Sequence, residues 1–174
     1  MAEQHKTNIY FLLDAARVLG DLDTAQKLQP DFLCLFQEKD GLDSVAPYLF
    51  SWMPGSAFAE WLFAKGWGNS WGLFVKTNVT PGELKNHFQK FIVVESGSGS
   101  QSYSRFYDPR VIKVLLPGYT AQKLIEFFGP VEKFIVEGNS QAEAMEFSQQ
   151  NGVLKKKNVD VSYQIMNFPG VTGE

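Results

Sequence analysis

The chain has 174 residues, of which 44% are hydrophobic and 14% aromatic, and its formal net charge at pH 7 is -3. This length is typical of one domain, because such a chain buries roughly 70% of its unfolded surface and needs no disulfide or metal to hold a core. The small charge, without a basic stripe, argues against nucleic acid as a partner.

Short strands and helices alternate in the first third of the chain. Continuous apolar runs at 9–13 and 32–36 predict strands covered on both faces, as in a parallel or mixed sheet. Residues 48–52 predict a third strand, and Ser56 is placed to cap a helix over 57–65. That helix is apolar around most of its circumference, so we expect it to be buried or covered by a partner.

The middle of the chain continues this alternation. Residues 71–76 predict a fourth strand. The motif Thr80-Pro81-Gly82-Glu83 combines a capping box with proline at the first helical position, which predicts a helix that runs to about Lys90. Residues 92–94 and 103–107 are expected to pair as strands, because the glycine- and serine-rich segment between them suits a connection.

The run at 105–111, with the sequence Arg-Phe-Tyr-Asp-Pro-Arg-Val, brings together a strand end, a helix cap and two arginines. A residue before proline avoids the α region, so we expect the strand to end at Asp108. Pro109 is tolerated in a first helical turn, which predicts a helix over about 109–116. The Asp108 carboxylate can accept hydrogen bonds from the free amides of that turn.

A further helix is expected after Pro117-Gly118, with Thr120 as its cap and Gly129-Pro130 as its end. Residues 134–136 then predict another strand. The inward face of the helix is expected to carry four apolar side chains, those of Leu124, Ile125, Phe127 and Phe128.

The C-terminal region at 143–166 is expected to form a hairpin and a one-sided strand. Asn151-Gly152 is a two-residue hairpin signal between strands at 143–149 and 153–158. The lysines at 155–157 are expected to protect an exposed sheet edge. Residues 1–174 thus predict a single α/β domain of the mixed α+β kind, with a central mixed sheet flanked by short helices and a C-terminal β-hairpin.

The single cysteine and the N-terminus predict a compartment. Cys34 cannot form an internal disulfide, and its apolar surroundings favour a small buried side chain over a reactive thiol. Residues 1–8 are polar, and no apolar run approaches the roughly 18 residues that span a bilayer. We therefore expect a cytoplasmic protein without membrane insertion.

Several polar residues have two interpretations. Arg105 and Arg110 can form a local ion network around the helix cap, or one of them can bind a carboxylate or carbonyl of a bound polypeptide. Asp14 ends a predicted strand, where ligands often bind in open α/β sheets, but it is also placed to cap a helix from Ala15. His87 is expected to be a partly buried helix residue bonded to backbone or carboxylate.

The strongest pattern for an enzyme is Gly68-Asn69-Ser70-Trp71-Gly72, which matches G-x-S-x-G. Its context is reversed, because a nucleophile elbow follows a strand and precedes a helix, whereas here a helix precedes and a strand follows. His87, one helix downstream, would have to be the base. The sequence has no zinc, paired-cysteine or calcium-loop pattern, so we expect no metal and no cofactor.

The run at 105–111 resembles the signature of the effector chaperones, or adaptors, of bacterial type VI secretion, and the similarity covers roughly 9–136. Members often have an arginine two places after the histidine, where this chain has Gln89, and many continue into a helical C-terminal lobe, whereas this sequence ends at Glu174. The matching positions are Pro47, Tyr48, Trp71, Gly72, His87, Phe106, Tyr107, Asp108 and Pro109.

The resemblance implies a non-enzymatic adaptor that binds a secreted effector protein in the producing bacterium and loads it onto the spike-tip protein. Aromatic anchors carry much of the energy of protein interfaces. We therefore expect the partner surface among Trp52, Phe58, Trp61 and Trp67, with Arg105 or Arg110 adding directional contacts. Two alternatives stay open: an immunity or inhibitor protein that binds an effector, and a small serine hydrolase that uses Ser70.

Overall fold

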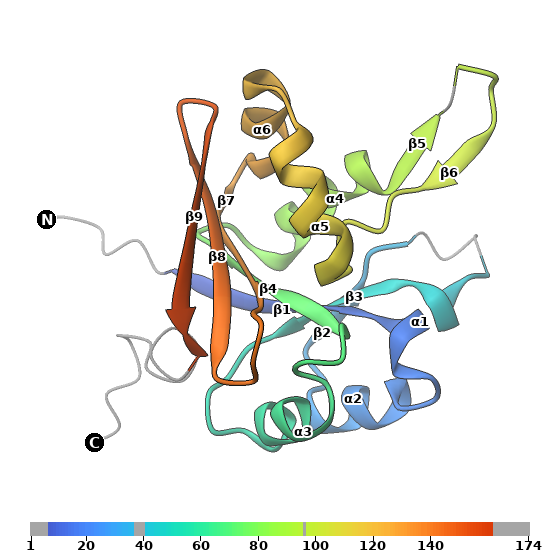
Figure 1. The fold of residues 1–174 in the computed structure, drawn as a ribbon. Coiled ribbons are helices and arrows are strands. Elements are labelled where there is room, and N and C mark those ends of the chain that lie inside the picture. Colours follow the sequence, from blue (N-terminus) through green and yellow to red (C-terminus); the bar gives the residue numbers. More distant parts are fainter. Residues whose placement is uncertain (1–6, 37–40, 96, 162–174) are drawn as a thin grey trace, which may run out of the picture.

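The computed structural model describes residues 7–36, 41–95 and 97–161 (Figure 1). Its main element is a seven-stranded sheet in the order β2-β3-β1-β4-β7-β8-β9. The strands are β1 (Asn8–Asp14), β2 (Phe32–Cys34), β3 (Pro47–Ser51), β4 (Gly72–Thr77), β7 (Val131–Glu137), β8 (Glu143–Gln150) and β9 (Val153–Asp160). The mixed α+β class, the flanking helices and the C-terminal hairpin are confirmed.

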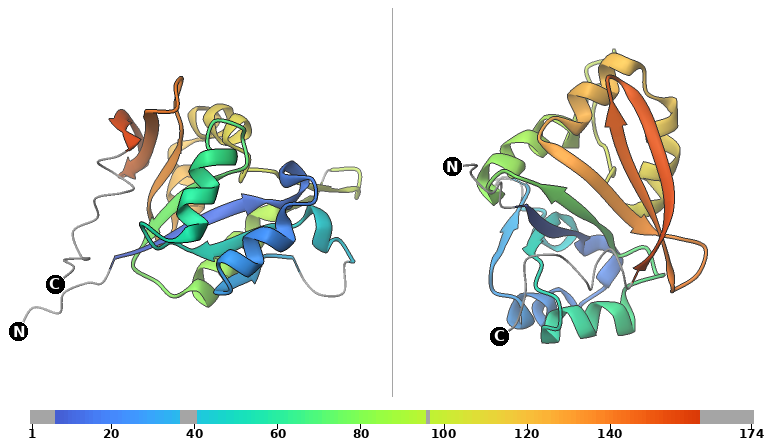
Figure 2. Two further views of the ribbon diagram at one scale, coloured as in Figure 1. Left: turned by 90° about the horizontal axis from the view of Figure 1, so that it is seen from below. Right: turned by 90° about the vertical axis from the view of Figure 1, so that its left-hand side faces the viewer.

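Neighbouring strands of this sheet all pair antiparallel among the described residues. The prediction of a central mixed sheet, which was based on the continuous apolar runs, is therefore wrong for this sheet. The reason for those runs is that helices lie on both sides of the central strands, α2 and α3 on one side and α4, α5 and α6 on the other (Figures 1 and 2). Continuous apolar runs therefore report burial on two faces and not strand direction.

The helices begin at the expected caps. Ser56 accepts a hydrogen bond from the Ala59 amide at 3.2 Å, and the capping box of Thr80 and Glu83 is complete. In that box the hydrogen bonds from Thr80 lower the pKa of Glu83. The helices are α1 (Ala15–Val18), α2 (Leu22–Leu28), α3 (Ala57–Lys65), α4 (Pro81–Ile92), α5 (Pro109–Leu115) and α6 (Ala121–Phe128), with 3-10 turns η2 (Asp43–Val45) and η3 (Leu116–Gly118).

The predicted pairing of two strands across the glycine- and serine-rich segment is confirmed, but the bounds of the second strand, predicted at 103–107, are wrong. The two-stranded hairpin consists of β5 (Val93–Glu95) and β6 (Gln101–Tyr103), and after Tyr103 the chain turns toward α5. The Asp108 amide closes this turn by donating to the Arg105 carbonyl at 2.9 Å. Phe106 and Tyr107 are both buried, which consecutive residues of a one-sided strand cannot be. The turn thus seats two aromatic rings in the core just before the helix.

The face of α6 is predicted correctly except at one residue. Leu124, Phe127 and Phe128 are buried, whereas Ile125 is 44% exposed. Successive helical residues are about 100° apart, so Ile125 lies to one side of the stripe that its three neighbours share. An apolar residue next to a buried stripe need not be part of it.

The C-terminal hairpin is confirmed. β8 and β9 pair along their whole length around Asn151 and Gly152, which both have positive φ, as the hairpin signal requires. Lys155 to Lys157 are exposed on β9, the last strand in the sheet order, where they were expected. The one-sided strand expected at the end of the region 143–166 lies mostly outside the described residues, which stop at residue 161.

In the described part of the chain, no helix combines the length and the apolar character that crossing a membrane requires.

Candidate functional site

Asp14 lies at the end of β1 and is fully buried. One carboxylate oxygen accepts a hydrogen bond from the Ala16 amide at 3.0 Å, which caps α1 as expected. The other accepts a hydrogen bond from the guanidinium of Arg105, whose side chain is 43% exposed. Asp14 therefore acts as a cap and as an anchor for an arginine.

Asp108 repeats this arrangement at the start of α5. It is 2% exposed and accepts a hydrogen bond from the Arg110 amide at 2.9 Å, so the predicted cap is confirmed. The Arg110 side chain also binds it side-on, Nε to Oδ1 at 3.0 Å and Nη2 to Oδ2 at 2.6 Å. A buried carboxylate thus holds an arginine that is 58% exposed in a two-point geometry.

The protonation of this cluster follows from burial and from the arginines. Burial raises the pKa of Asp14, and Arg105 only partly offsets that effect. Burial also acts on Asp108, but the hydrogen bonds from Arg110 outweigh it and lower the pKa. Burial and the charge of Asp14 raise the pKa of Tyr107 to about 12. Hydrogen bonds to the carboxylates raise the pKa of both arginines, which stay charged.

Glu137, which the sequence analysis did not single out, holds the connection between α3 and β4 in place. This residue ends β7 and is 8% exposed. Its carboxylate accepts hydrogen bonds from the amide of Gly68 at 2.8 Å, from the amide of Ser70 at 3.1 Å and from the Ser70 hydroxyl at 3.0 Å. Its charge also contributes to the raised pKa of Arg110. One feature of the sequence could have indicated Glu137: it is an acidic residue at the end of an apolar strand, as Asp14 is.

Ser70 and His87 make separate hydrogen bonds. Ser70, whose φ is 58°, donates its hydroxyl to Glu137, whereas Nε2 of His87 donates to the Phe127 carbonyl at 2.8 Å. The expected role of His87 as a helix residue bonded to backbone is confirmed. Ser70 follows α3 and precedes β4, which is the reverse of the order that a nucleophile elbow requires.

Lowering the pH is expected to destabilise the fold through His87. Burial lowers the pKa of His87, and the hydrogen bond to Phe127 only partly offsets this. Because the unfolded chain binds the proton more readily, the stability that neutral His87 contributes is present above about pH 6.5 and is lost as the pH falls through the folded pKa. The urea midpoint should therefore fall between about pH 7.5 and about pH 5.5. A His87→Gln variant with an equally steep fall would contradict this assignment.

Two of the four aromatic residues expected on a partner surface are in the core. Phe58 is 0% and Trp67 is 2% exposed, because they pack on Phe50 and Phe74 with ring centroids 5.0 Å and 5.5 Å apart. Neither side chain is available to a partner in this conformation. Trp52 and Trp61 are only partly buried, at the margin of the same core. The apolar α3 is thus covered mainly by its own sheet.

The remaining motif positions serve the fold. Pro47 and Pro109 are buried at the starts of β3 and α5. The Tyr48 hydroxyl donates to the Asp43 carbonyl at 3.0 Å, and Trp71 is 9% exposed. The side chain of Gln89, the residue two places after His87, donates to the Leu35 carbonyl at 3.0 Å. These residues shape the scaffold, whereas Arg105 and Arg110 are exposed.

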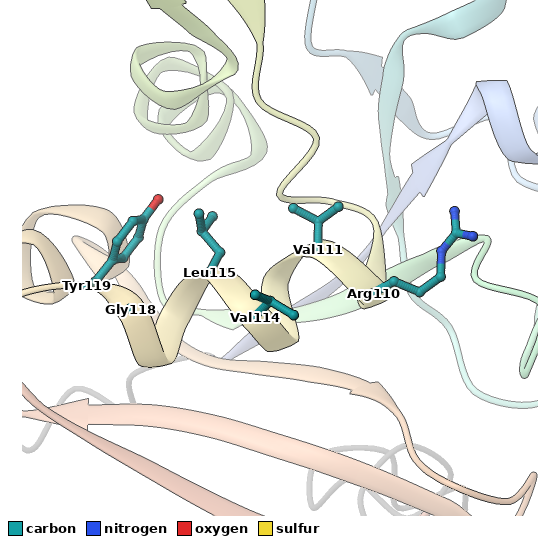
Figure 3. Close-up of a pocket in the computed structure, with 6 residues that line it drawn as sticks. All are labelled: Arg110, Val111, Val114, Leu115, Gly118 and Tyr119. Carbon is teal, nitrogen blue, oxygen red and sulfur yellow. The ribbon is translucent and has the colours of Figure 1, made fainter.

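An apolar groove adjoins Arg110. It has a volume of about 520 Å³ and runs along α5 and η3 (Figure 3). Val114 is the most exposed of its apolar residues, at 76%. The lining residues are Arg110, Val111, Val114, Leu115, Gly118 and Tyr119. We did not predict this groove from the sequence, because we considered only the cap at the start of α5 and not the exposed face of the helix.

A comparison with protein families matches residues 9–126 to the family described as Domain of unknown function (DUF4123). The chain belongs to this family. No curated protein and no solved structure matches the chain. The DUF4123 match runs from β1 into α6. It therefore contains the ion pairs Arg105–Asp14 and Arg110–Asp108 and the whole groove, whereas Glu137 lies outside it.

Proposed function

We propose that this DUF4123 protein is a non-enzymatic adaptor of type VI secretion. In the cytoplasm of the producing bacterium it binds a secreted effector protein and passes it to the spike-tip protein. The observation that carries the proposal is the pairing of an exposed apolar groove with a guanidinium that a buried carboxylate holds in place. The resemblance of the run at 105–111 to effector adaptors supplies the identity of the partner.

The chemistry of the groove suits a polypeptide. A partner that excludes water from the apolar floor of the groove makes the free energy of binding more favourable. Two nitrogens of Arg110 bind Asp108. Its remaining N–H groups can donate to a carboxylate or carbonyl of a partner. A side chain that is already held in one geometry loses little rotamer entropy on binding.

Hydrogen bonding at Ser70 supports binding over catalysis. Its hydroxyl donates to the Glu137 carboxylate, which also accepts from two backbone amides of the same turn. These bonds give Ser70 and Glu137 a structural role in the α3–β4 connection. The histidine in the described residues donates to a carbonyl on α6 and so is engaged elsewhere.

The proposal is tested by co-expressing the tagged chain with each protein encoded next to it. We expect one of them to be captured as a stable complex, to keep its toxic activity while bound, and to be secreted only when this chain is present. Capture with loss of toxicity would instead identify an inhibitor protein. If no neighbouring product were captured, the adaptor function would be wrong.

A further inference from the structure

The groove lies between two rows of side chains on one helical surface. Val111, Leu115 and Tyr119 are spaced four residues apart and rise from one side, as Figure 3 shows. Val114 and Gly118, also four apart, form the second row. Rows with this spacing are the ridges between which another helix inserts its own ridge. The second row is interrupted at Gly118, where a Cβ would meet no atom within 4 Å.

The N-terminal end of the groove carries a guanidinium. Arg110 lies there, where Asp108 holds it through two nitrogens and leaves further N–H groups to donate. Lys123 is not among the lining residues, since its ammonium lies 5.1 Å from the centre of the Phe91 ring and 5.9 Å from that of Tyr119. An apolar floor with a guanidinium at one end is complementary to a segment with apolar residues and an acidic residue at the matching end.

We propose that this groove binds an amphipathic helix of the partner protein, with an acidic side chain of that helix against Arg110. The identity of the partner rests on the proposed adaptor function. α5 and η3 together extend for about 16 Å, the length of roughly three helical turns, so three apolar residues at positions i, i+4 and i+7 fill the floor. A helix fits better than a strand, because the lining residues come from a helical surface without a strand edge.

A designed peptide tests this binding without the effector. The probe is a helical peptide of about 18 residues with leucine at i, i+4 and i+7 and one glutamate at the end that reaches Arg110. Its twin has lysine in place of that glutamate. Measured by fluorescence anisotropy, the glutamate peptide should bind the wild-type chain, and the lysine twin should bind about tenfold more weakly. Failure of the glutamate peptide to bind would overturn the proposal.

Two pairs of variants locate the site. Gly118→Trp fills the groove and should abolish binding of the glutamate peptide, whereas Gly82→Trp, at another open position on α4, should leave it unchanged. Arg110→Gln should remove the preference for glutamate over lysine, whereas Lys113→Gln, the same loss of charge outside the groove lining, should keep it. Thermal melting checks that each variant is folded.

Three results would overturn the proposal: equal binding by wild type and Gly118→Trp, an unchanged preference in Arg110→Gln, or a wild-type dimer that Gly118→Trp dissociates. The last would show that a second copy occupies the groove. Peptide binding in the groove together with no captured effector would leave this inference standing and remove the adaptor function. Capture of an effector by wild type and by Gly118→Trp alike would keep the function and remove the groove as its site.

Discussion

Replacing Gly72 with alanine is expected to destabilise the fold by about 3 kcal/mol or more. A Cβ at Gly72 would lie 2.1 Å from the Leu12 carbonyl oxygen and 3.0 Å from the Leu13 Cα. Both are backbone atoms of β1, which pairs with β3 and β4 on its two sides and so cannot move away without losing hydrogen bonds. The measurement is the free energy of unfolding from urea denaturation.

The same substitution at Gly82 is the control. A Cβ there would meet no atom within 4 Å, and Gly82 lies in the first turn of α4, where alanine is the better helix former. Gly82→Ala should therefore change stability by less than about 1 kcal/mol, in the stabilising direction. If the two variants had equal stability, the close approach of β1 to Gly72 would not be the reason for glycine in the Trp71-Gly72 motif.

Replacing Arg105 with glutamine is expected to cost about 2 kcal/mol, because it leaves the Asp14 carboxylate fully buried without its ion pair. This figure is smaller than for a pair buried on both sides, since the Arg105 side chain is 43% exposed and its charge is partly screened. Asp14→Asn keeps the cap on the Ala16 amide while it removes the charge. The double variant should therefore recover most of the loss, which a double-mutant cycle measures.

The pH dependence gives this prediction a second readout. Burial already raises the pKa of Asp14, and loss of Arg105 removes the main group that lowers it, while the hydrogen bond from the Ala16 amide remains. A raised pKa means that the folded state binds the proton more readily, so stability falls as the pH rises above the ordinary pKa of an aspartate. The deficit of Arg105→Gln should therefore shrink between about pH 7 and about pH 4. A deficit that did not change over this range would show that Asp14 is not the group that responds.

The Gly72→Ala and Arg105→Gln variants test the scaffold, whereas the Gly118→Trp and Arg110→Gln variants test the binding surface. Gly72 and the pair of Asp14 and Arg105 support the packing of β1 against β4 and the turn before α5, so their loss lowers stability. Gly118 faces outward, so its variant should change binding while stability stays the same. Arg110→Gln should change binding and should also lower stability, because it removes the ion pair of the buried Asp108. Residues of both kinds lie within the DUF4123 match at 9–126, so the match alone does not identify the partner surface.

Local chemistry was readable from the sequence because it acts within a few residues. Ser56, Thr80, Asp108 and Thr120 all cap the helices they were expected to cap, since a cap depends on one side chain and the amides that follow it. The Asn151-Gly152 hairpin is predictable for the same reason, because two positive-φ residues determine the turn. The α+β class follows from these elements in order.

Tertiary contacts decided what no local pattern contains. Whether Phe58 and Trp67 face a partner or the core depends on which strands lie opposite them, and β3 and β4 bury both rings. Glu137 meets Ser70 across 67 positions of sequence, and Arg105 meets Asp14 across 91. The groove on α5 exists because the elements packed around that helix leave one face uncovered. The sequence by itself determined most of the elements and the caps that begin the helices, because these depend on neighbouring residues, whereas burial and long-range pairing, which depend on the whole chain, determined the site.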